Sequence, residues 1–576
     1  MKKIKSLFLL IPDSYFIQLI LLGIFVMIIY SHTLNVPFYL DDYPSIVENI
    51  IIQNPDFISI WKYSTFRTIT YLTFALNYLF HQHEVTGYHV LNILIHFLAG
   101  SAVLFFIKSI ISIPTINKQT LLKINIWLPF ITALIFVLHP LQTQAVTYIV
   151  QRLASFAAFF YVSCIASYIK ARLNKQNTKI RCLYFIFFII FGTLALFTKE
   201  NTFTLFIMIP MVEIIFFQKK NNQSRWIIIG TLLFTSILLF GILAFIKGFN
   251  IFSLKNIDSF TRMGTDMSRK TYLYYQFYII WIYIKLFFIP KGFHLDYEIS
   301  SAILDRTVFW ALSGHLFVII IAFMLKNRNQ LISFFILFYY VTHLIESSIL
   351  PIKDLCFEHR TYLPNIGLSF LTAYFFLFII ANIHKPVMKH FSIVLLVLYF
   401  ILLGSITWQR NQMWNDPINF WQDCSIFSPH KSRVWAEFGK HLMLAKRNKE
   451  AINAFSNAIK FSEDQSGHKK LDIQIVCNLI VLFHKTGQTD RALKLTDRAL
   501  KQPMNALYMF YMLNNKGNIY LEKKEFSKAE RCYHQAIKTY PNNKMAVKGL
   551  YNALMLQGRI DEAKKIILKL KQSNDQ

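Results

Sequence analysis

The chain is organised around the apolar run Phe16-Ile-Gln-Leu-Ile-Leu-Leu-Gly-Ile-Phe-Val-Met-Ile-Ile-Tyr30 and the acidic stretch after it, Asn35-Val-Pro-Phe-Tyr-Leu-Asp41-Asp42-Tyr-Pro44. The run predicts a membrane-spanning helix, which would hold two adjacent carboxylates at the membrane face. Acidic residues are scarce, with 31 Asp and Glu against 60 Lys and Arg. The pair is therefore a candidate for catalysis or metal binding. A solvated turn is the alternative, because Asp beside Pro is ordinary turn chemistry.

Similar apolar runs recur as far as Trp408 and predict a polytopic, all-helical membrane domain. The chain has 576 residues, and 55% of them are hydrophobic. The apolar residues gather in runs of about 16–22, most of them long enough to cross a hydrocarbon core of about 30 Å. We expect about eleven spans. They are 14–32, 88–110, 124–139, 146–169, 181–198, 202–217, 226–246, 307–325, 331–349, 362–382 and 390–408.

Short basic loops give the orientation of these spans. Much of the net charge of +29 lies in loops between the apolar runs, as the positive-inside rule predicts for cytoplasmic loops. The run 272–290 is expected to be re-entrant or interfacial, because a full crossing there would move the basic turn 326–329 to the wrong side. The expected cytoplasmic segments are 2–5, 118–123, 170–181, 218–225, 326–329 and 384–390. The expected non-cytoplasmic segments are 33–87, 139–144, 198–201, 247–306, 346–364 and the tail after 408.

The sequence disfavours nucleic-acid binding, cysteine-based structural sites and a cleaved signal peptide. Nucleic-acid binding is not expected, because no basic stripe with interleaved aromatic residues lies on a soluble face. The 6 cysteines are scattered without any C-x-x-C spacing, so a disulfide framework or structural zinc site is not expected either. The basic start of the chain resembles a secretory signal, but no small-x-small site follows the long apolar run, so we expect an uncleaved anchor.

Polar residues lie along the second and fourth predicted spans. His89, Asn92 and His96 are spaced by three and four residues and therefore share one stripe of a helix. Hydrogen bonding within the bundle explains such a stripe at least as well as catalysis does. His139 begins the stretch that leads to Arg152, which we place about two turns inside the fourth span. An unpaired charge there is costly, so we expect a carboxylate or a bound phosphate beside Arg152.

Two charged clusters fall on the same expected face. Lys199-Glu200-Asn201 lies at a hairpin between two spans, where a solvated turn is an equal alternative. Glu358-His359-Arg360 stands directly before a span, and both Arg and a helix N-terminus favour an anionic phosphate. An interfacial anchor is the alternative for this cluster. His81-Gln-His83-Glu84 has the spacing of metal ligands but no companion carboxylate motif, so no metal site is assigned to it.

An acidic pair with cations at a membrane face suits transfer of a group from a lipid-linked phosphate or pyrophosphate. A carboxylate would act as general base toward an acceptor hydroxyl, and cations would neutralise the leaving phosphate. A proton-coupled transporter would instead place carboxylates within its spans. The predicted spans are nearly free of Asp and Glu, which disfavours transport.

A repeat appears in the polar tail. The equivalent alanines Ala451, Ala492, Ala529 and Ala563 are separated by 41, 37 and 34 residues, which converges on the tetratricopeptide period. Small residues at these positions allow two helices to pack closely, and neighbouring repeats bury each other's apolar faces. We therefore expect a membrane domain over 1–410, a linker over 411–430 and a tetratricopeptide α-solenoid over 431–576. Its concave face would hold extended peptide or serve as a structural cap.

Taken together, these motifs resemble the transmembrane and tetratricopeptide repeat-containing family, which is grouped with the GT-C fold glycosyltransferases. The resemblance covers nearly the whole chain. Two positions depart from the family pattern: Gln144 replaces a usual glutamate, and Thr68 replaces a usual proline after Arg67. The matching motifs are Leu40-Asp41-Asp42 with Glu48-Asn49, Gly87-Tyr88-His89-x-x-Asn92-x-x-x-His96, His139-Pro140-Leu-Gln-Thr-Gln-Ala-Val with Arg152, Lys199-Glu200-Asn201, Glu358-His359-Arg360-x-Tyr362-Leu-Pro364, and Arg410-Asn411 with Trp414.

The resemblance implies an O-glycosyltransferase, mannosyltransferase-like, that takes a sugar from a polyprenyl phosphate. Asp41 or Asp42 would be the catalytic base, and Asp42 would be the ligand if a divalent metal takes part. The expected donor-phosphate and substrate-binding residues are Arg152, Lys199, Glu200, His359, Arg360, His89 and His139.

The acceptor implied by the resemblance is a hydroxyl, such as Ser or Thr of a protein held by the repeats. The expected location is a bacterial inner membrane with the repeats in the periplasm, and the alternative is an endoplasmic reticulum membrane with the repeats in the lumen. A membrane-anchored repeat scaffold without enzymatic activity is the competing function.

Overall fold

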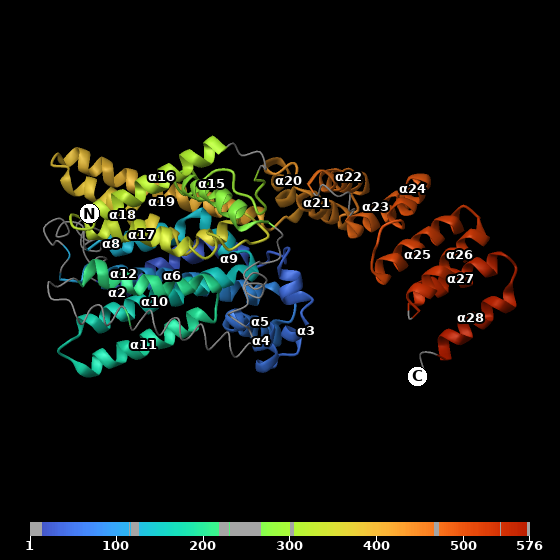
Figure 1. Ribbon diagram of the computed structural model, residues 1–576, viewed down its shortest axis with the longest axis horizontal. Coiled ribbons are helices and arrows are strands. Elements are labelled where there is room, and N and C mark those ends of the chain that lie inside the picture. The colour runs from blue at the N-terminus through green and yellow to red at the C-terminus, as the bar shows by residue number, and fades with distance from the viewer. Residues whose placement is uncertain are drawn as a thin grey trace. The chain divides into compact units, whose positions relative to one another are not determined.

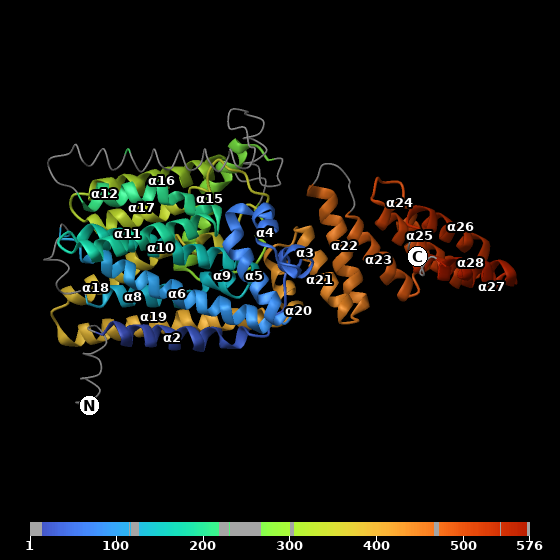
Figure 2. The same ribbon diagram turned by 90° about the horizontal axis from the view of Figure 1, so that it is seen from below.

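The computed structural model describes residues 14–114, 116, 126–217, 230, 267–299, 305–465, 472–541 and 543–572. Over these residues the secondary structure is helical (Figures 1 and 2). The chain divides into two compact units, Met1–Asp416 and Pro417–Gln576, here named the membrane unit and the repeat unit. Apart from residue 230, the predicted span 226–246 lies outside the described residues, and so do the basic segments 2–5, 118–123 and 218–225.

Among the described residues of the membrane unit, seven helices are long and apolar enough to cross a membrane, or eight if α8 and the helical turns after it form one span bent by 57°. Helices α12 and α17 are apolar but shorter, with 12 and 14 residues. The all-helical membrane architecture expected from the sequence is thus confirmed, with an approximate span count. The main helices are α2 (Tyr15–Tyr30), α6 (Val85–Ile111), α8 (Leu128–Leu138), α10 (Arg152–Leu173), α11 (Thr178–Leu196), α12 (Leu205–Phe216), α15 (Arg269–Phe288), α16 (Asp305–Leu325), α17 (Gln330–His343), α18 (Asn365–Asn382) and α19 (Pro386–Met413).

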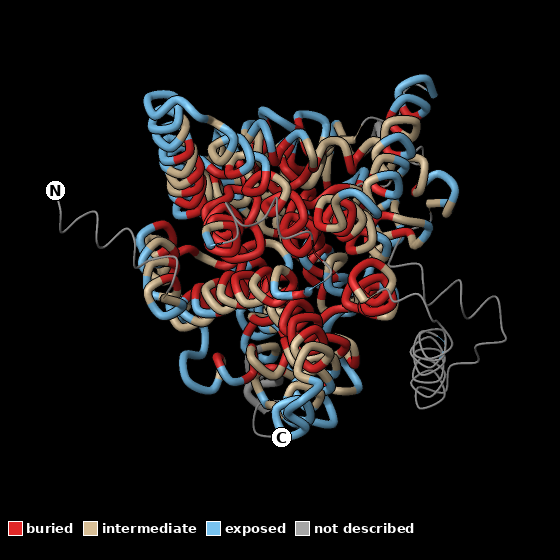
Figure 3. Tube along the Cα trace, turned by 90° about the vertical axis from the view of Figure 1, so that its left-hand side faces the viewer, coloured by how far each residue is buried: buried red, intermediate tan, exposed pale blue. Residues whose placement is uncertain are grey.

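Burial separates central helices from lipid-facing ones. Within their most apolar windows the span Ile149–Leu173, which contains α10, is 89% buried, whereas α11 and α19 are 11% and 17% buried. Figure 3 shows buried residues toward the middle of the view and exposed ones toward its edge. The exposed positions on α11 and α19 are largely Ile, Leu, Val and Phe. Contiguous apolar surface of this extent would be unstable in water, so these helices face lipid.

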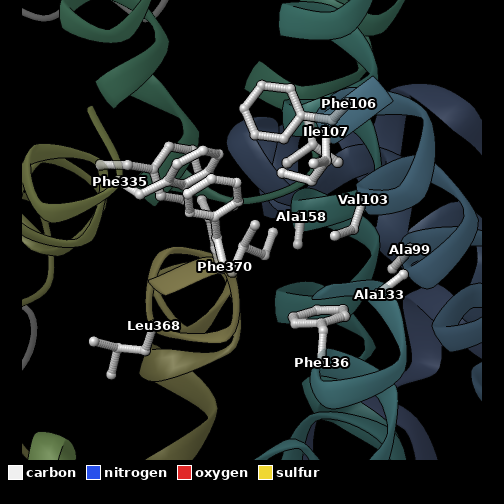
Figure 4. Close-up of a cluster of buried hydrophobic side chains, with 14 of the residues drawn as sticks. Ala99, Val103, Phe106, Ile107, Ala133, Phe136, Ala158, Phe335, Leu368 and Phe370 are labelled. Carbon is white, nitrogen blue, oxygen red and sulfur yellow. The ribbon is translucent and has the colours of Figure 1, made fainter. Parts of the chain in front are cut away.

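The apolar core lies where α6, α8, α10, α17 and α18 meet (Figure 4). The rings of Phe335 and Phe370 stack with centroids 3.7 Å apart. A Cβ added to Gly367 would come within 2.8 Å of the Phe335 carbonyl oxygen. Helices α17 and α18 therefore approach too closely at this point for any residue with a side chain.

The predicted loop 33–87 is mostly helical. It contains one π-helical turn, Tyr43–Val47, immediately after the acidic pair, and the helices α3 (Ile50–Gln53), α4 (Phe57–Tyr63) and α5 (Thr68–His81). Leu40, directly before the pair, has a φ of 30°, a strained conformation for a residue with a branched side chain.

Helix α15 contains the run that was expected to be re-entrant or interfacial. It is one continuous helix of 20 residues, so the re-entrant alternative is wrong. In its first turn the Tyr272 hydroxyl donates to the Glu346 carbonyl (2.7 Å), and in its last turn the Phe287 carbonyl accepts from His139 Nε2 (2.9 Å). Both partners belong to segments expected on the non-cytoplasmic face, which agrees with the interfacial alternative.

The repeat unit is a series of antiparallel helix pairs preceded by α20. Ala451, Ala492, Ala529 and Ala563 are all fully buried. Residues 411–430, expected as a linker, instead contain the end of α19 and the whole of α20, because Phe420 and Trp421 give α20 an apolar face to bury. The helices are α20 (Pro417–Phe427), α21 (Ser432–Leu444), α22 (Asn448–Gln465), α23 (Ile473–Lys485), α24 (Thr489–Ala499), α25 (Ala506–Glu522), α26 (Phe526–Thr539), α27 (Lys544–Leu556) and α28 (Ile560–Gln572).

Candidate active site

The two aspartates have different environments. Asp42 is fully buried, and both of its carboxylate oxygens accept backbone hydrogen bonds, Oδ2 from Tyr39 at 2.9 Å and Oδ1 from Val150 at 2.7 Å. Asp41 is exposed. Asp42 therefore ties the acidic loop to the start of α10, whereas Asp41 lies at the surface.

Aromatic side chains hold the backbone on either side of the pair. The Asp41 N–H donates to the Tyr148 hydroxyl (2.7 Å), and the Tyr39 hydroxyl donates to the carbonyl of Trp414 (2.7 Å). The Trp414 ring packs against both tyrosine rings, at 5.9 Å from Tyr148 and 5.1 Å from Tyr39. Leu40, with its strained backbone, therefore lies between two residues that are each fixed by a hydrogen bond. Together these contacts hold Asp41 in one position.

Arg152 is buried in a cage of neutral oxygens. Its Nε donates to Asn92 Oδ1 (2.5 Å), and its Nη1 donates to Asn77 Oδ1 (2.8 Å) and Thr73 Oγ1 (3.0 Å). Its Nη2 donates to the carbonyl of Tyr88 (2.9 Å). The sequence predicted a carboxylate or phosphate partner, but neutral oxygens take these four bonds. Arg152 joins α5, α6 and α10, while Asp42 is near enough for an electrostatic interaction.

The histidines of the predicted stripe bond within the bundle. His89 Nε2 donates to the Val36 carbonyl (2.8 Å), and His96 Nε2 donates to the Val137 carbonyl (3.1 Å). The Tyr362 hydroxyl lies 2.6 Å from His96 Nδ1. These bonds fit the packing alternative for the stripe, although His89 Nδ1 is buried and has no hydrogen-bond partner among the described residues.

His139 also has both ring nitrogens engaged. Besides the bond from Nε2 to Phe287, its Nδ1 accepts from the N–H of Leu141 at 3.2 Å, and its ring stacks on Phe287 with centroids 4.2 Å apart. The residue thus caps the helical turn 140–142 and attaches it to α15. This geometry gives His139 a positioning role.

Lys199 and Glu200 each form an ion pair across the bundle. Lys199 Nζ lies 2.7 Å from Glu346 Oε1, and both side chains are nearly buried. Glu200 accepts two bonds from Arg67 Nε, at 2.9 and 3.1 Å. Burial opposes ionisation of Glu200, but Arg67 and Lys199 hold its pKa below the ordinary value. The solvated-turn alternative for this motif is therefore wrong.

His359 lies among three cations. Its N–H and its Nδ1 both bond Gln144 Oε1, at 2.7 and 2.9 Å. Burial, reinforced by the charges of Lys199, Arg360 and Arg67, lowers the pKa of His359 well below the usual range. The fold thus brings the 199–201 motif, the 358–360 motif and Arg67 together.

The residues on either side of His359 are also buried and bonded. Glu358 accepts from the Tyr297 hydroxyl (2.5 Å) and pairs with Arg410, whose Nη1 donates to the Pro140 carbonyl (2.6 Å). Arg360 donates to the carbonyls of Asp354 (2.6 Å) and Leu355 (3.0 Å). This motif is a buried junction, so the interfacial-anchor alternative is wrong.

Four contributors were not singled out as site residues from the sequence: Arg67, Glu346, Tyr148 and Tyr297. Glu346 could be predicted from the sequence, because an acidic residue at the end of an apolar run requires a partner. Over the described parts of the chain, no three His, Cys, Asp or Glu side chains converge as metal ligands do. Asp42, the expected metal ligand, has both oxygens engaged by amide groups.

Known proteins match this chain in both units. Residues 510–543 match the family model of the tetratricopeptide repeat. A protein O-mannosyl-transferase of Caenorhabditis elegans is 26% identical over 457 residues, which cover 75% of this chain and 61% of that protein. The protein O-mannosyl-transferase TMTC3 of Homo sapiens is 20% identical over 555 residues, which cover 88% of this chain and 57% of that protein.

The predicted family resemblance is confirmed. Both relatives are named protein O-mannosyl-transferases, the human one is named TMTC3, and a tetratricopeptide repeat is present in this chain. The chain spans about three fifths of the length of these two relatives, 61% and 57%.

Proposed function

We propose that the protein is an integral membrane glycosyltransferase that moves a sugar from a polyprenyl-phosphate donor to a hydroxyl acceptor. Two kinds of observation support this. The relatives are named protein O-mannosyl-transferases. The fold also gathers the 199–201 motif, the 358–360 motif and Arg67 around His359, and it exposes Asp41 beside the buried Asp42.

Asp41 is the general base in this proposal. The observation that carries it is the contrast within the acidic pair, since Asp42 is buried and accepts two amide bonds while Asp41 is exposed on a strained, anchored loop. The acceptor hydroxyl would lose its proton to Asp41 as its oxygen bonds the anomeric carbon. The bond from that carbon to the phosphate oxygen would break, and the electron pair would leave with the polyprenyl phosphate.

The donor phosphate would bind at the cations around His359. Lys199, Arg67 and Arg360 all act electrostatically on this side chain, so an anion placed beside it would be attracted by all three. Glu346 and Glu200 now neutralise Lys199 and Arg67, and a phosphate would compete with them. Arg152 and His139 would then hold other parts of the site in place instead of binding the phosphate, because their polar groups are already bonded to the protein.

The acceptor is proposed to be Ser or Thr of a protein or peptide, on the non-cytoplasmic side of a bacterial inner membrane. A repeat scaffold without activity is the second candidate function, favoured by the helix pairs of the repeat unit. The solenoid is compatible with both, since a repeat groove can deliver an acceptor to an enzyme or simply recruit a partner.

The test is sugar transfer by the purified protein in lipid nanodiscs. Labelled polyprenyl-phosphate mannose and other polyprenyl-linked sugars are offered with a peptide extract, to wild type, Asp41→Asn and Glu48→Gln. Glu48 is a matched control because it is an exposed acid in the same loop. We expect transfer that Asp41→Asn reduces at least 100-fold and Glu48→Gln leaves nearly unchanged. Absence of transfer from every donor by folded wild type would favour the scaffold.

A further inference from the structure

We infer that a groove between α2, α6, α10 and α11 binds an anionic phospholipid of the cytoplasmic leaflet. The groove has a volume of about 300 Å³ and is open on one side. Its lining is mainly aromatic and apolar, with Tyr15, Phe105, Phe159 and Tyr184 among its members. An open apolar groove on the outside of a membrane bundle suits an acyl chain.

Two lysines stand beside the groove. Lys108 Nζ lies 4.7 Å from the centroid of the Tyr15 ring, and Lys170 Nζ lies 5.9 Å from the centroid of the Phe105 ring. Both rings line the groove. The two ammonium groups also repel each other electrostatically, so they share one region of space. A single phosphate near both of them would relieve that repulsion.

Lys108 and Lys170 have no acidic partner in the described part of the chain. Among the described residues no carboxylate forms an ion pair with Lys108 or Lys170, whereas Arg172, at the same end of α10, pairs with Glu213 at 2.6 Å. The loops that follow the two lysines, 112–127 and 171–182, contain no Asp or Glu in the sequence. Lysines at helix ends commonly extend toward water, but the pair here also flanks a groove that an acyl chain fits.

The orientation of α6 and α10 indicates that the bound lipid comes from the cytoplasmic leaflet. Lys108 and Lys170 lie in the last turns of α6 and α10, next to the basic loops expected in the cytoplasm. Basic pockets between helices on that side bind anionic headgroups. Asp41 follows the opposite end of α2, and His89 lies at the opposite end of α6. The lipid site is therefore separate from the proposed catalytic face and does not depend on the proposed reaction.

The test is native mass spectrometry of the delipidated protein titrated with phosphatidylglycerol or phosphatidylcholine of identical acyl chains. We expect the first bound phosphatidylglycerol to be retained about tenfold more strongly than phosphatidylcholine. The double variant Lys108→Gln/Lys170→Gln should lose this preference. The matched control Lys385→Gln/Lys389→Gln changes two exposed lysines at the start of α19, a helix that contributes no residue to the groove lining, and should keep it.

Three outcomes would overturn the assignment. They are equal retention of the two lipids by wild type, an unchanged preference in the Lys108/Lys170 variant, and displacement of the lipid by soluble glycerol phosphate, which would indicate a phosphate site without a chain site. Ser101→Leu adds bulk to the groove lining without a change of charge and should weaken retention of phosphatidylglycerol by severalfold. This single variant keeps the test decisive if the double variant does not fold.

Discussion

The Asp42 carboxylate accepts a hydrogen bond of 2.7 Å from the backbone N–H of Val150, which is 108 residues away in the chain. This bond attaches the loop after α2 to the entrance of α10. Because the second oxygen of Asp42 accepts from Tyr39, the carboxylate holds both sides of the turn that presents Asp41. The acidic pair thus combines a structural carboxylate with an accessible one.

Asp42→Asn should destabilise the protein more than Asp41→Asn. An amide can accept through only one of its two terminal atoms, so one backbone N–H loses its acceptor in the buried site. An unsatisfied buried donor costs about 1–3 kcal/mol. Thermal unfolding of the purified variants measures the difference. Equal melting temperatures for Asp42→Asn and wild type would contradict the structural role of this carboxylate.

The pair of Glu200 and Arg67 should make stability depend on acid pH. The pKa of Glu200 is lowered in the folded protein, so its contribution is fully present above the pKa of the unfolded chain, about 4.3. The contribution is lost as the pH falls through the lower, folded-state pKa. Melting temperatures of wild type and Glu200→Gln should therefore differ at pH 7 and converge toward pH 3. Glu48→Gln, at an exposed position, is the control and should melt as wild type does at pH 7.

Gln144→Glu, which restores the residue usual in the family, should raise the pKa of His359. A carboxylate in place of the amide oxygen would receive the His359 N–H and Nδ1 bonds and favour the imidazolium. The substitution would also remove the buried Nε2 group of Gln144, which has no hydrogen-bond partner in the described part of the chain. A histidine-selective NMR titration measures the shift, and His359→Gln identifies the signal. An unchanged or lower pKa would contradict the prediction.

Gly517→Ala should loosen the third helix pair of the repeat unit. A Cβ at Gly517 would lie 2.6 Å from the ring of Tyr533, so α25 and α26 must separate or the buried ring must move. Such overpacking costs about 1–3 kcal/mol. Hydrogen exchange of the whole chain should become faster over 506–539. Ser527→Ala, at an exposed position of α26, is the control and should leave exchange unchanged.

Much of the architecture could be predicted from local pattern. Helices such as α6 and α19 lie close to their predicted spans because a long apolar run must satisfy its backbone groups internally in lipid. The repeat alanines are all buried because close helix packing requires small residues. The continuous helix α15 was harder to predict, since Gln276 and Lys285 interrupt the apolar pattern while Gln276 is buried through a bond to the Leu355 carbonyl (3.1 Å).

The sequence by itself determined the membrane and repeat architecture, the family resemblance and the residues from which the site is built. Only the tertiary structure decided their roles. Asp41 and Asp42 are chemically identical and adjacent, but the fold buries Asp42 and directs the amide groups of Tyr39 and Val150 at its carboxylate, while Asp41 is exposed. Arg152 and Lys199 are both buried cations, but one is surrounded by amide, hydroxyl and carbonyl oxygens and the other by a carboxylate. Such partners lie tens to hundreds of residues apart, so no local pattern encodes them.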